Sequence, residues 1–309
     1  MTTDRLCAIS VDLDEVPHYF AIHGLPLEGS DAHAAYDRAL PRLGAFAEAR
    51  RVPLTLFAVG ADLERPESAE VIRVFSKRGH AIENHSLNHR YDLTRLSRDE
   101  IKREVAGGAG AIERVTGRRP KGFRAPGYTV SDALFDVLEE ERVAFDSSVF
   151  PCPPYYLAKA AALAGMRLRG RTSRSVLDTP RVLTAPTKPY RPGSKWYRSG
   201  FRSFLELPIQ VTRGLRLPFI GTSVELAGRR GAAWLARGCA GASLVNLELH
   251  AIDFLDVSEG VEKLRGHQPE LARPLEDRLA ALGSALDALK SAGYSFVRLD
   301  EAAAAQTSI

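Results

Sequence analysis

The sequence predicts an α/β fold, a closed or nearly closed barrel of seven or eight parallel strands with helices between them. Short apolar runs alternate along the chain with segments of helical periodicity, which is the pattern of successive βαβ units. Polar and titratable side chains stand directly after several of these runs. A chain of 309 residues, without an internal repeat or an obvious linker, is long enough to form one such domain over residues 1–309.

The first strand is the apolar run 6–11, and three acids follow it: Asp12, Asp14 and Glu15. Charge at the end of a buried strand is unfavourable unless something pairs with it. Prolines and glycines predict a loop over residues 16–30, and a helix should follow up to about residue 50. The second strand is expected over residues 54–59. A helix over about residues 68–77 then leads to a strand that ends at His85.

The middle and the end of the chain continue this alternation. Ser97 and Glu100 form a capping box that predicts a helix to about residue 115, and Ser131 should cap another. Short strands are expected over residues 121–124 and 143–146. Later strands are expected over residues 204–209, 244–249 and 296–299. A stripe of leucines predicts a helix from Leu275 to Leu289, before the last strand.

Residues 151–203 interrupt the alternation and form a basic, aromatic-rich insert. Between Arg167 and Arg202 there are ten Lys or Arg residues and one acid, so this segment carries +9 and the remaining chain −5. It is interpreted as a solvated loop, as a site for a phosphate-bearing substrate such as a nucleotide- or lipid-linked amino sugar, or as a contact with anionic membrane through residues 167–220. In the second interpretation, Trp196 and the tyrosines of the insert would stack on sugar. No nucleic-acid-binding motif is present, and the acidic remainder argues against a nucleic-acid partner.

Three cysteines bear on the compartment. They are odd in number and widely spaced, which favours a reducing environment over a disulfide framework or a zinc ribbon: Cys7, Cys152 and Cys239. No apolar run approaches the roughly 18 residues of a membrane span, and the N-terminal residues lack the pattern of a secretory signal. We expect a cytoplasmic protein, with peripheral membrane contact only through the insert and its apolar neighbour, residues 215–220.

The stretch 83–89 carries two histidines four residues apart, His85 and His89. On a helical turn both imidazoles would face one side, where they could bind one divalent metal ion. The zinc-protease motif is excluded, because Ser86 rather than Glu follows the first histidine. An isolated pair of this kind is as readily two surface histidines. The metal interpretation is favoured because Asp12, Arg124 and His250 stand at the ends of other predicted strands.

Four motifs, in this order along the chain, resemble those of the polysaccharide deacetylase family (NodB homology, carbohydrate esterase family 4). They are Ser-Val-Asp-Leu-Asp at 10–14, His-Ser-Leu-Asn-His at 85–89, Arg-Ala-Pro-Gly-Tyr at 124–128 and Leu-Glu-Leu-His at 247–250. The resemblance covers nearly the whole chain. It implies a distorted (β/α) barrel and metal-assisted hydrolysis of an N-acetyl group on a sugar.

The resemblance also implies roles for particular residues. It makes Asp14, His85 and His89 the ligands of a divalent ion, most commonly Zn²⁺, with Co²⁺, Mn²⁺ or Ni²⁺ as alternatives. It makes Asp12 the general base and Arg124 the cation that pairs with that base. The implied general acid is His250, and the backbone N–H of Tyr128 would hold the oxyanion.

The first motif departs from the commonest form in the family, in which the two aspartates are adjacent and are followed by glycine. Here Leu13 separates them, so Asp12 and Asp14 lie on one face of an extended strand. Both Asp14 and Glu15 therefore stay candidates for the third metal ligand. We favour Asp14, because it shares a face with Asp12.

The expected function is a metal-dependent hydrolase that removes an N-acetyl group from an amino sugar of a glycan, glycan precursor or glycolipid. One alternative is an amidohydrolase of the same superfamily that acts on a non-sugar amide, a cyclic imide or a formamide. A second alternative is a catalytically silent glycan-binding protein. All the implied chemical roles have a residue, and a silent relative would be expected to lose its base or its acid. The oligomeric state is open.

Overall fold

One parallel sheet runs through the structure, a computed structural model that describes residues 5–27, 29, 31–168, 170 and 172–307. Its strand order is β6-β5-β4-β3-β2-β1-β7, and β8 pairs with β1. Among the described residues the strands are β1 (Leu6–Asp12), β2 (Leu54–Ala58), β3 (Ala81–Asn84), β4 (Gly122–Phe123), β5 (Phe145–Asp146), β6 (Leu205–Glu206), β7 (Leu244–His250) and β8 (Ser295–Phe296).

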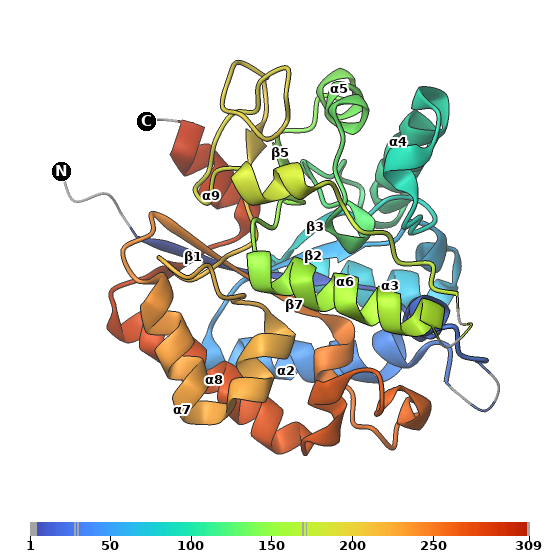
Figure 1. Cartoon of the computed structure of the whole chain (residues 1–309), viewed down its shortest axis with the longest axis vertical. Coiled ribbons are helices and arrows are strands. Elements are labelled where there is room, and N and C mark those ends of the chain that lie inside the picture. Colours follow the sequence, from blue (N-terminus) through green and yellow to red (C-terminus); the bar gives the residue numbers. More distant parts are fainter. Residues whose placement is uncertain (1–4, 28, 30, 169, 171, 308–309) are drawn as a thin grey trace.

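The sheet curls toward a barrel. Beyond β6, the N–H of Gln210 donates to the carbonyl of Asn246 on β7 at 3.0 Å. The Asn246 side chain donates in return to the carbonyl of Leu207 at 3.1 Å. These bonds join the two outermost strands of the order across the interior, so the predicted distorted (β/α) barrel is confirmed. In Figure 1 the strands lie at the centre, the helices surround them, and α6 passes across the front.

Helices follow most of the strands, as the alternation predicted. The longer helices of the described chain are α1 (Val16–His23), α2 (Leu40–Arg50), α3 (Pro66–Lys77), α4 (Arg98–Thr116), α5 (Asp132–Glu140), α6 (Pro153–Leu168), α7 (Gly221–Cys239), α8 (Leu275–Ser291) and α9 (Leu299–Thr307). Short helical turns include η1 (Ala35–Ala39), η2 (Ala61–Glu64), η3 (Leu93–Arg95), η4 (Pro126–Tyr128), η5 (Pro180–Thr184), η6 (Ala251–Phe254), η7 (Glu262–Leu264) and η8 (Pro269–Ala272). The capping box of Ser97 and Glu100 opens α4 as predicted.

The largest core lies where β1, β2 and β7 meet α2, α7 and α8. Ile9, Leu56 and Leu247 of the strands are buried there with Leu286 of α8. The outward side chains of these strands pack against helices and the inward ones fill the barrel, so both faces are buried and the runs are largely apolar, which is why they stood out in the sequence.

Several predicted elements were wrong. Residues 16–23 form α1 rather than a loop, since Glu15 caps them and Pro17 stands in the first turn, where proline is tolerated. Of the predicted loop 16–30, residues 28 and 30 lie outside the described residues. Helix α7 was not predicted, because glycines break its periodicity and Gly228 kinks it at φ 64°. The last predicted strand ends at Phe296, and α9 follows it.

The insert is more ordered than predicted. It contains α6, whose alanine-rich sequence favours a helix and whose two prolines lie at its start. Trp196 is only 3% exposed and packs against Phe135 of α5, with ring centroids 6.4 Å apart. The expectation that Trp196 stacks on sugar is therefore wrong, because its ring belongs to a second core. Tyr156 and Tyr190 are buried as well.

The apolar segment 215–220 exposes less apolar surface to a membrane than expected. Phe219 and Ile220 are buried in the protein, and Leu215 is the large apolar side chain that the segment exposes. Within the described chain, no helix combines the length and hydropathy needed to cross a bilayer.

Candidate active site

The predicted site residues meet at the carboxyl edge of the sheet. Asp12 ends β1 and stands directly beside His250, the last residue of β7, in the strand register. His85 follows β3 and Arg124 follows β4. Because the carboxyl ends of parallel strands lie at one edge, residues far apart in sequence come together there. A pocket of about 160 Å³ at this edge is lined by residues that include Asp12, Asp14, His85, Tyr128 and His250.

Asp14, His85 and His89 converge as a group of potential metal ligands. One carboxylate oxygen of Asp14 lies 3.2 Å from His85 Nε2, and the other lies 3.1 Å from His89 Nε2. The two Nε2 atoms are 3.2 Å apart. All three side chains are buried, and their ligand atoms lie within 4.8 Å of one another. The structure thus places the three residues predicted as ligands around one point.

The tautomer of His85 fits metal binding. Its Nδ1 lies 2.8 Å from the carbonyl oxygen of Arg124. A carbonyl only accepts, so Nδ1 carries the proton and the lone pair of Nε2 faces Asp14 and His89. Two imidazole nitrogens and a carboxylate at one buried point are the donor set that zinc and similar ions prefer. Burial disfavours the charge of Asp14, but His89 and His85 outweigh it and hold the pKa of Asp14 well below its usual range.

The histidine loop is not the predicted helical turn. Ser86 and His89 have left-handed backbone conformations, with φ of 69° and 52°. The side chain of Asn84 accepts the N–H of Ser86 at 3.0 Å, and the hydroxyl of Ser86 accepts the N–H of His89 at 3.1 Å. These local bonds replace the helical ones, and they still bring the two imidazoles together.

Helix α4 supports this loop. Its Glu104 accepts the backbone and side-chain N–H groups of Asn88, at 2.9 and 2.7 Å. Its Gly108 lies so close that a Cβ there would stand 2.2 Å from Oδ1 of Asn84. This support was not predicted, although a glycine inside a helical pattern is a signal for close packing.

Glu15, the other candidate for the third ligand, has a different position. Its carboxylate caps α1 and accepts the N–H groups of Val16 and Ala35, each at 3.2 Å. Burial and the nearby Asp62 raise the pKa of Glu15 to about 8. The geometry favours Asp14 as the ligand.

Arg124 is buried and points at Asp12. Its Nη1 donates to Oδ1 of Asp12 at 2.8 Å, and its Nη2 donates to the hydroxyls of Ser10 and Ser147 at the same distance. The face of Phe57 lies 4.2 Å from the guanidinium carbon. Arg124 is thus not a surface residue: it holds a carboxylate in one orientation at the floor of the pocket.

His250 lies between an acid and a phenol. Its Nδ1 is 3.0 Å from Oε1 of Glu248, and its Nε2 is 3.3 Å from the hydroxyl of Tyr128. Burial opposes the charge on His250, but Glu248, Asp14 and Asp12 outweigh it and raise the pKa of His250 to about 9. No sequence pattern pointed to a role for Glu248. It stands two residues before His250 on one strand, and this spacing puts both on the same face.

The backbone N–H of Tyr128, the predicted oxyanion donor, donates to the carbonyl of Ala125 at 3.1 Å. Tyr128 itself is left-handed, with φ 60°. To bind an oxyanion, this N–H would have to share or exchange its present partner, and the role stays a prediction. Asp253 accepts the N–H of His250 at 2.9 Å and also lines the pocket.

Lys159 of α6 also lines the pocket, and no sequence pattern pointed to it. Its Nζ donates to the carbonyl of Gly127 at 3.3 Å. Burial lowers the pKa of Lys159 to about 8. The insert thus contributes a cation directly to the site.

The fold and the site define a (β/α) barrel protein with a candidate divalent-metal centre at the carboxyl edge of its strands. Residues 32–144 match the family described as polysaccharide deacetylase, so the resemblance predicted from the motifs is confirmed. The chain matches no curated protein at a significant level.

Solved structures carry the same fold. A protein from Mycobacterium smegmatis assigned to the polysaccharide deacetylases has a TM-score of 0.60 at 18% identity, over 98% of this chain and 91% of its own. The Xyl-CE4 domain of a xylanase from the hindgut metagenome of Trinervitermes trinervoides has a TM-score of 0.50 at 15% identity, over 96% and 89%. A CE4 family pseudoenzyme from Bacillus anthracis has a TM-score of 0.52 at 12% identity, over 97% and 66%. At these identities the likeness shows the fold.

Proposed function

We propose that the protein is a metal-dependent hydrolase that removes an N-acetyl group from an amino sugar of a glycan, a glycan precursor or a glycolipid. The observation that carries this proposal is the joint position of three groups at one edge of the sheet. They are the ligand set Asp14, His85 and His89, the Asp12–Arg124 pair, and His250.

Asp14, His85 and His89 would hold the divalent ion, with Zn²⁺ first and Co²⁺, Mn²⁺ or Ni²⁺ as alternatives. When bound, such an ion acts as a Lewis acid toward the amide carbonyl and lowers the pKa of water to about 7. The donor set suits that ion, because three protein ligands leave positions for water and substrate.

Asp12 would take the proton of the attacking water as general base. Its carboxylate is aimed by Arg124, which holds one of its oxygens at 2.8 Å. His250 would deliver a proton from Nε2 to the leaving amine nitrogen, while Glu248 holds its Nδ1. The backbone N–H of Tyr128 would donate a hydrogen bond to the oxyanion. Because this N–H now donates to the carbonyl of Ala125, the 125–128 turn would have to adjust when substrate binds.

The family similarity supports a carbohydrate substrate. The burial of Trp196 removes one sequence-based reason for preferring a sugar, so non-sugar amides and formamides belong in the same assay. The three cysteines are free and buried, which is consistent with a reducing compartment such as the cytoplasm.

The Asp12→Asn variant tests this function. If Asp12 is the base, hydrolysis should fall by about 10²–10⁴-fold while bound metal stays at the wild-type level. A protein that only binds glycans would show no hydrolysis in the wild type and unchanged glycan affinity in the variant. Equal hydrolysis rates in wild type and variant would rule out Asp12 as the base.

A further inference from the structure

A second and larger cavity adjoins the candidate metal centre. It encloses about 860 Å³, and its walls come from the segment 88–95, from α6 and from residues 173–177. His89 lines it, while Tyr91 and Ser175 line both this cavity and the smaller pocket. The two pockets are therefore neighbours that share part of their walls.

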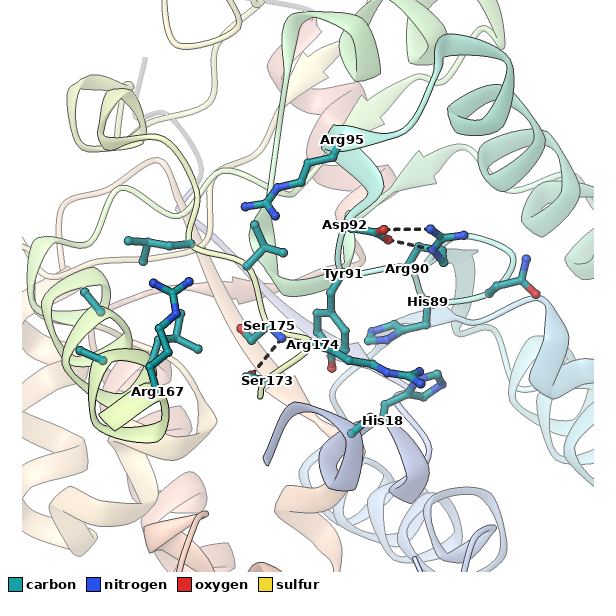
Figure 2. Close-up of a pocket in the computed structure, with 17 residues that line it drawn as sticks. His18, His89, Arg90, Tyr91, Asp92, Arg95, Arg167, Ser173, Arg174 and Ser175 are labelled. Atoms are coloured by element: carbon teal, nitrogen blue, oxygen red, sulfur yellow. Dashed lines mark hydrogen bonds and ion pairs between the residues drawn. The ribbon is translucent and has the colours of Figure 1, made fainter. Parts of the chain in front are cut away.

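Four arginines line this cavity, and one of them is neutralised by an acid. Arg90 forms two bonds of 2.8 Å with Asp92. Arg95, Arg167 and Arg174 have no ion-pair partner among the residues that the structure describes, and all three are exposed. Figure 2 shows Arg95 and Arg167 entering from opposite sides of the cavity, and Arg174 reaching toward His18. The cavity therefore holds a local excess of positive charge.

Two other basic residues of the insert pair with acids of α5. Arg202 is buried against Asp136 and Glu139 of α5. Lys195 pairs with Asp132 at the start of the same helix. Two cations of the insert thus join it to α5, whereas Arg167 and Arg174 line the cavity beside the candidate metal centre.

Helix α6 connects the two pockets. It presents Lys159 to the smaller pocket and Arg167 to the larger cavity, about 12 Å further along its axis. Between them, Ala160, Leu163 and Ala164 form an apolar surface on the cavity side. The helix therefore offers cations at both ends of an apolar strip.

We propose that Arg95, Arg167 and Arg174 bind a phosphate group of the substrate, so that the substrate is an acyl-amino sugar carried on phosphate. Guanidinium groups match phosphate oxygens in geometry and charge, and three of them that pair with no acid in the described part of the chain favour an anion over a neutral glycan. The sugar would lie near Lys159 with its amide at the metal centre. This inference rests on the proposed function for the amide, but the phosphate site is testable by binding alone.

The test compares two triple variants that each remove three exposed arginines. One is R95Q/R167Q/R174Q, and its matched control is R229Q/R230Q/R237Q, whose arginines line a different cavity on α7. Calorimetry with N-acetylglucosamine 1-phosphate should show affinity about tenfold weaker or more in the first variant. The control should stay within about twofold of wild type, and metal content should be equal in all three proteins. Affinity for N-acetylglucosamine itself should be the same in all three proteins. The difference in sugar-phosphate affinity between wild type and R95Q/R167Q/R174Q should shrink with added salt.

Equal affinity of wild type and R95Q/R167Q/R174Q for the sugar phosphate would overturn the proposal. Acetate release separates the two inferences. If phosphate-bearing and neutral substrates react equally well with both variants, the hydrolase proposal stands and the phosphate site falls. If no substrate releases acetate but the loss of sugar-phosphate affinity persists, the phosphate site stands and the hydrolase proposal falls. Preference for a uridine diphosphate sugar or for a polyprenyl phosphate sugar would then identify the carrier.

Discussion

Nη1 of Arg124 donates to Oδ1 of Asp12 at 2.8 Å, and this bond spans the interior of the half-closed barrel. Arg124 follows β4 and Asp12 ends β1, and two strands lie between them in the sheet. Both side chains are buried. The pair therefore stabilises the curvature of the sheet as well as aiming the proposed base.

Removing the cation should be costly. Arg124→Met leaves a buried carboxylate without its partner, and we expect unfolding free energy to fall by about 3–5 kcal/mol. The exposed Arg118→Met should change it by less than about 0.5 kcal/mol. Urea denaturation of both variants measures the difference. The double variant Asp12→Asn, Arg124→Met should recover part of the loss, and strict additivity of the two changes would contradict a direct pairing.

Glu248 should set the pH range of activity. Burial lowers the pKa of His250, but the nearby carboxylates raise it to about 9, and the largest of these contributions comes from Glu248. An acid catalyst works only while protonated, so kcat/KM should fall as the pH rises through this pKa. In Glu248→Gln the alkaline limb should move down by more than about one pH unit, toward the ordinary value of about 6.5. An unchanged limb, as expected for the exposed control Glu262→Gln, would exclude this coupling.

Two glycines of α4 provide a matched test of the histidine loop. A Cβ at Gly108 would stand 2.2 Å from Asn84 Oδ1, whereas at Gly110 the nearest atom is 3.5 Å away, on the flexible Arg114. Gly108→Ala should displace the loop, lower stability by about 1–3 kcal/mol and weaken metal binding. Gly110→Ala should raise stability by up to about 1 kcal/mol, because alanine favours the helix. Thermal unfolding and zinc titration would show both effects, and equal metal affinity in the two variants would contradict the packing argument.

The sequence predicted the parts of the fold that depend on local pattern. The apolar runs of β1, β2 and β7 are buried on both faces, and the capping box of Ser97 marks a helix start that depends only on neighbouring residues. Helix α7 was missed because its glycines are accommodated by packing, which a single-sequence pattern does not contain. The same is true of Gly108, whose meaning depends on Asn84 from another element.

The grouping of the candidate site residues was predictable to a similar extent. Side chains at strand ends meet by topology, so Asp12, Asp14, His85 and His250 could be grouped in advance. The backbone conformation of the histidine loop could not be predicted, because the left-handed conformations of Ser86 and His89 are fixed by hydrogen bonds to particular side chains. The role of Lys159 could not be predicted either, because it depends on the position of α6 over the pocket.

The most direct test of the account is metal content measured together with acetate release. Purified protein, with and without a chelator, would be analysed for bound metal and assayed on N-acetylglucosamine oligomers and on N-acetylglucosamine 1-phosphate. The account predicts about one divalent ion per chain, held by Asp14, His85 and His89, and acetate release that the chelator abolishes and zinc restores. The Asp14→Asn variant should lose both the bound ion and acetate release. A protein that takes up no divalent ion on titration, or that releases acetate equally well after the metal is removed, would contradict it.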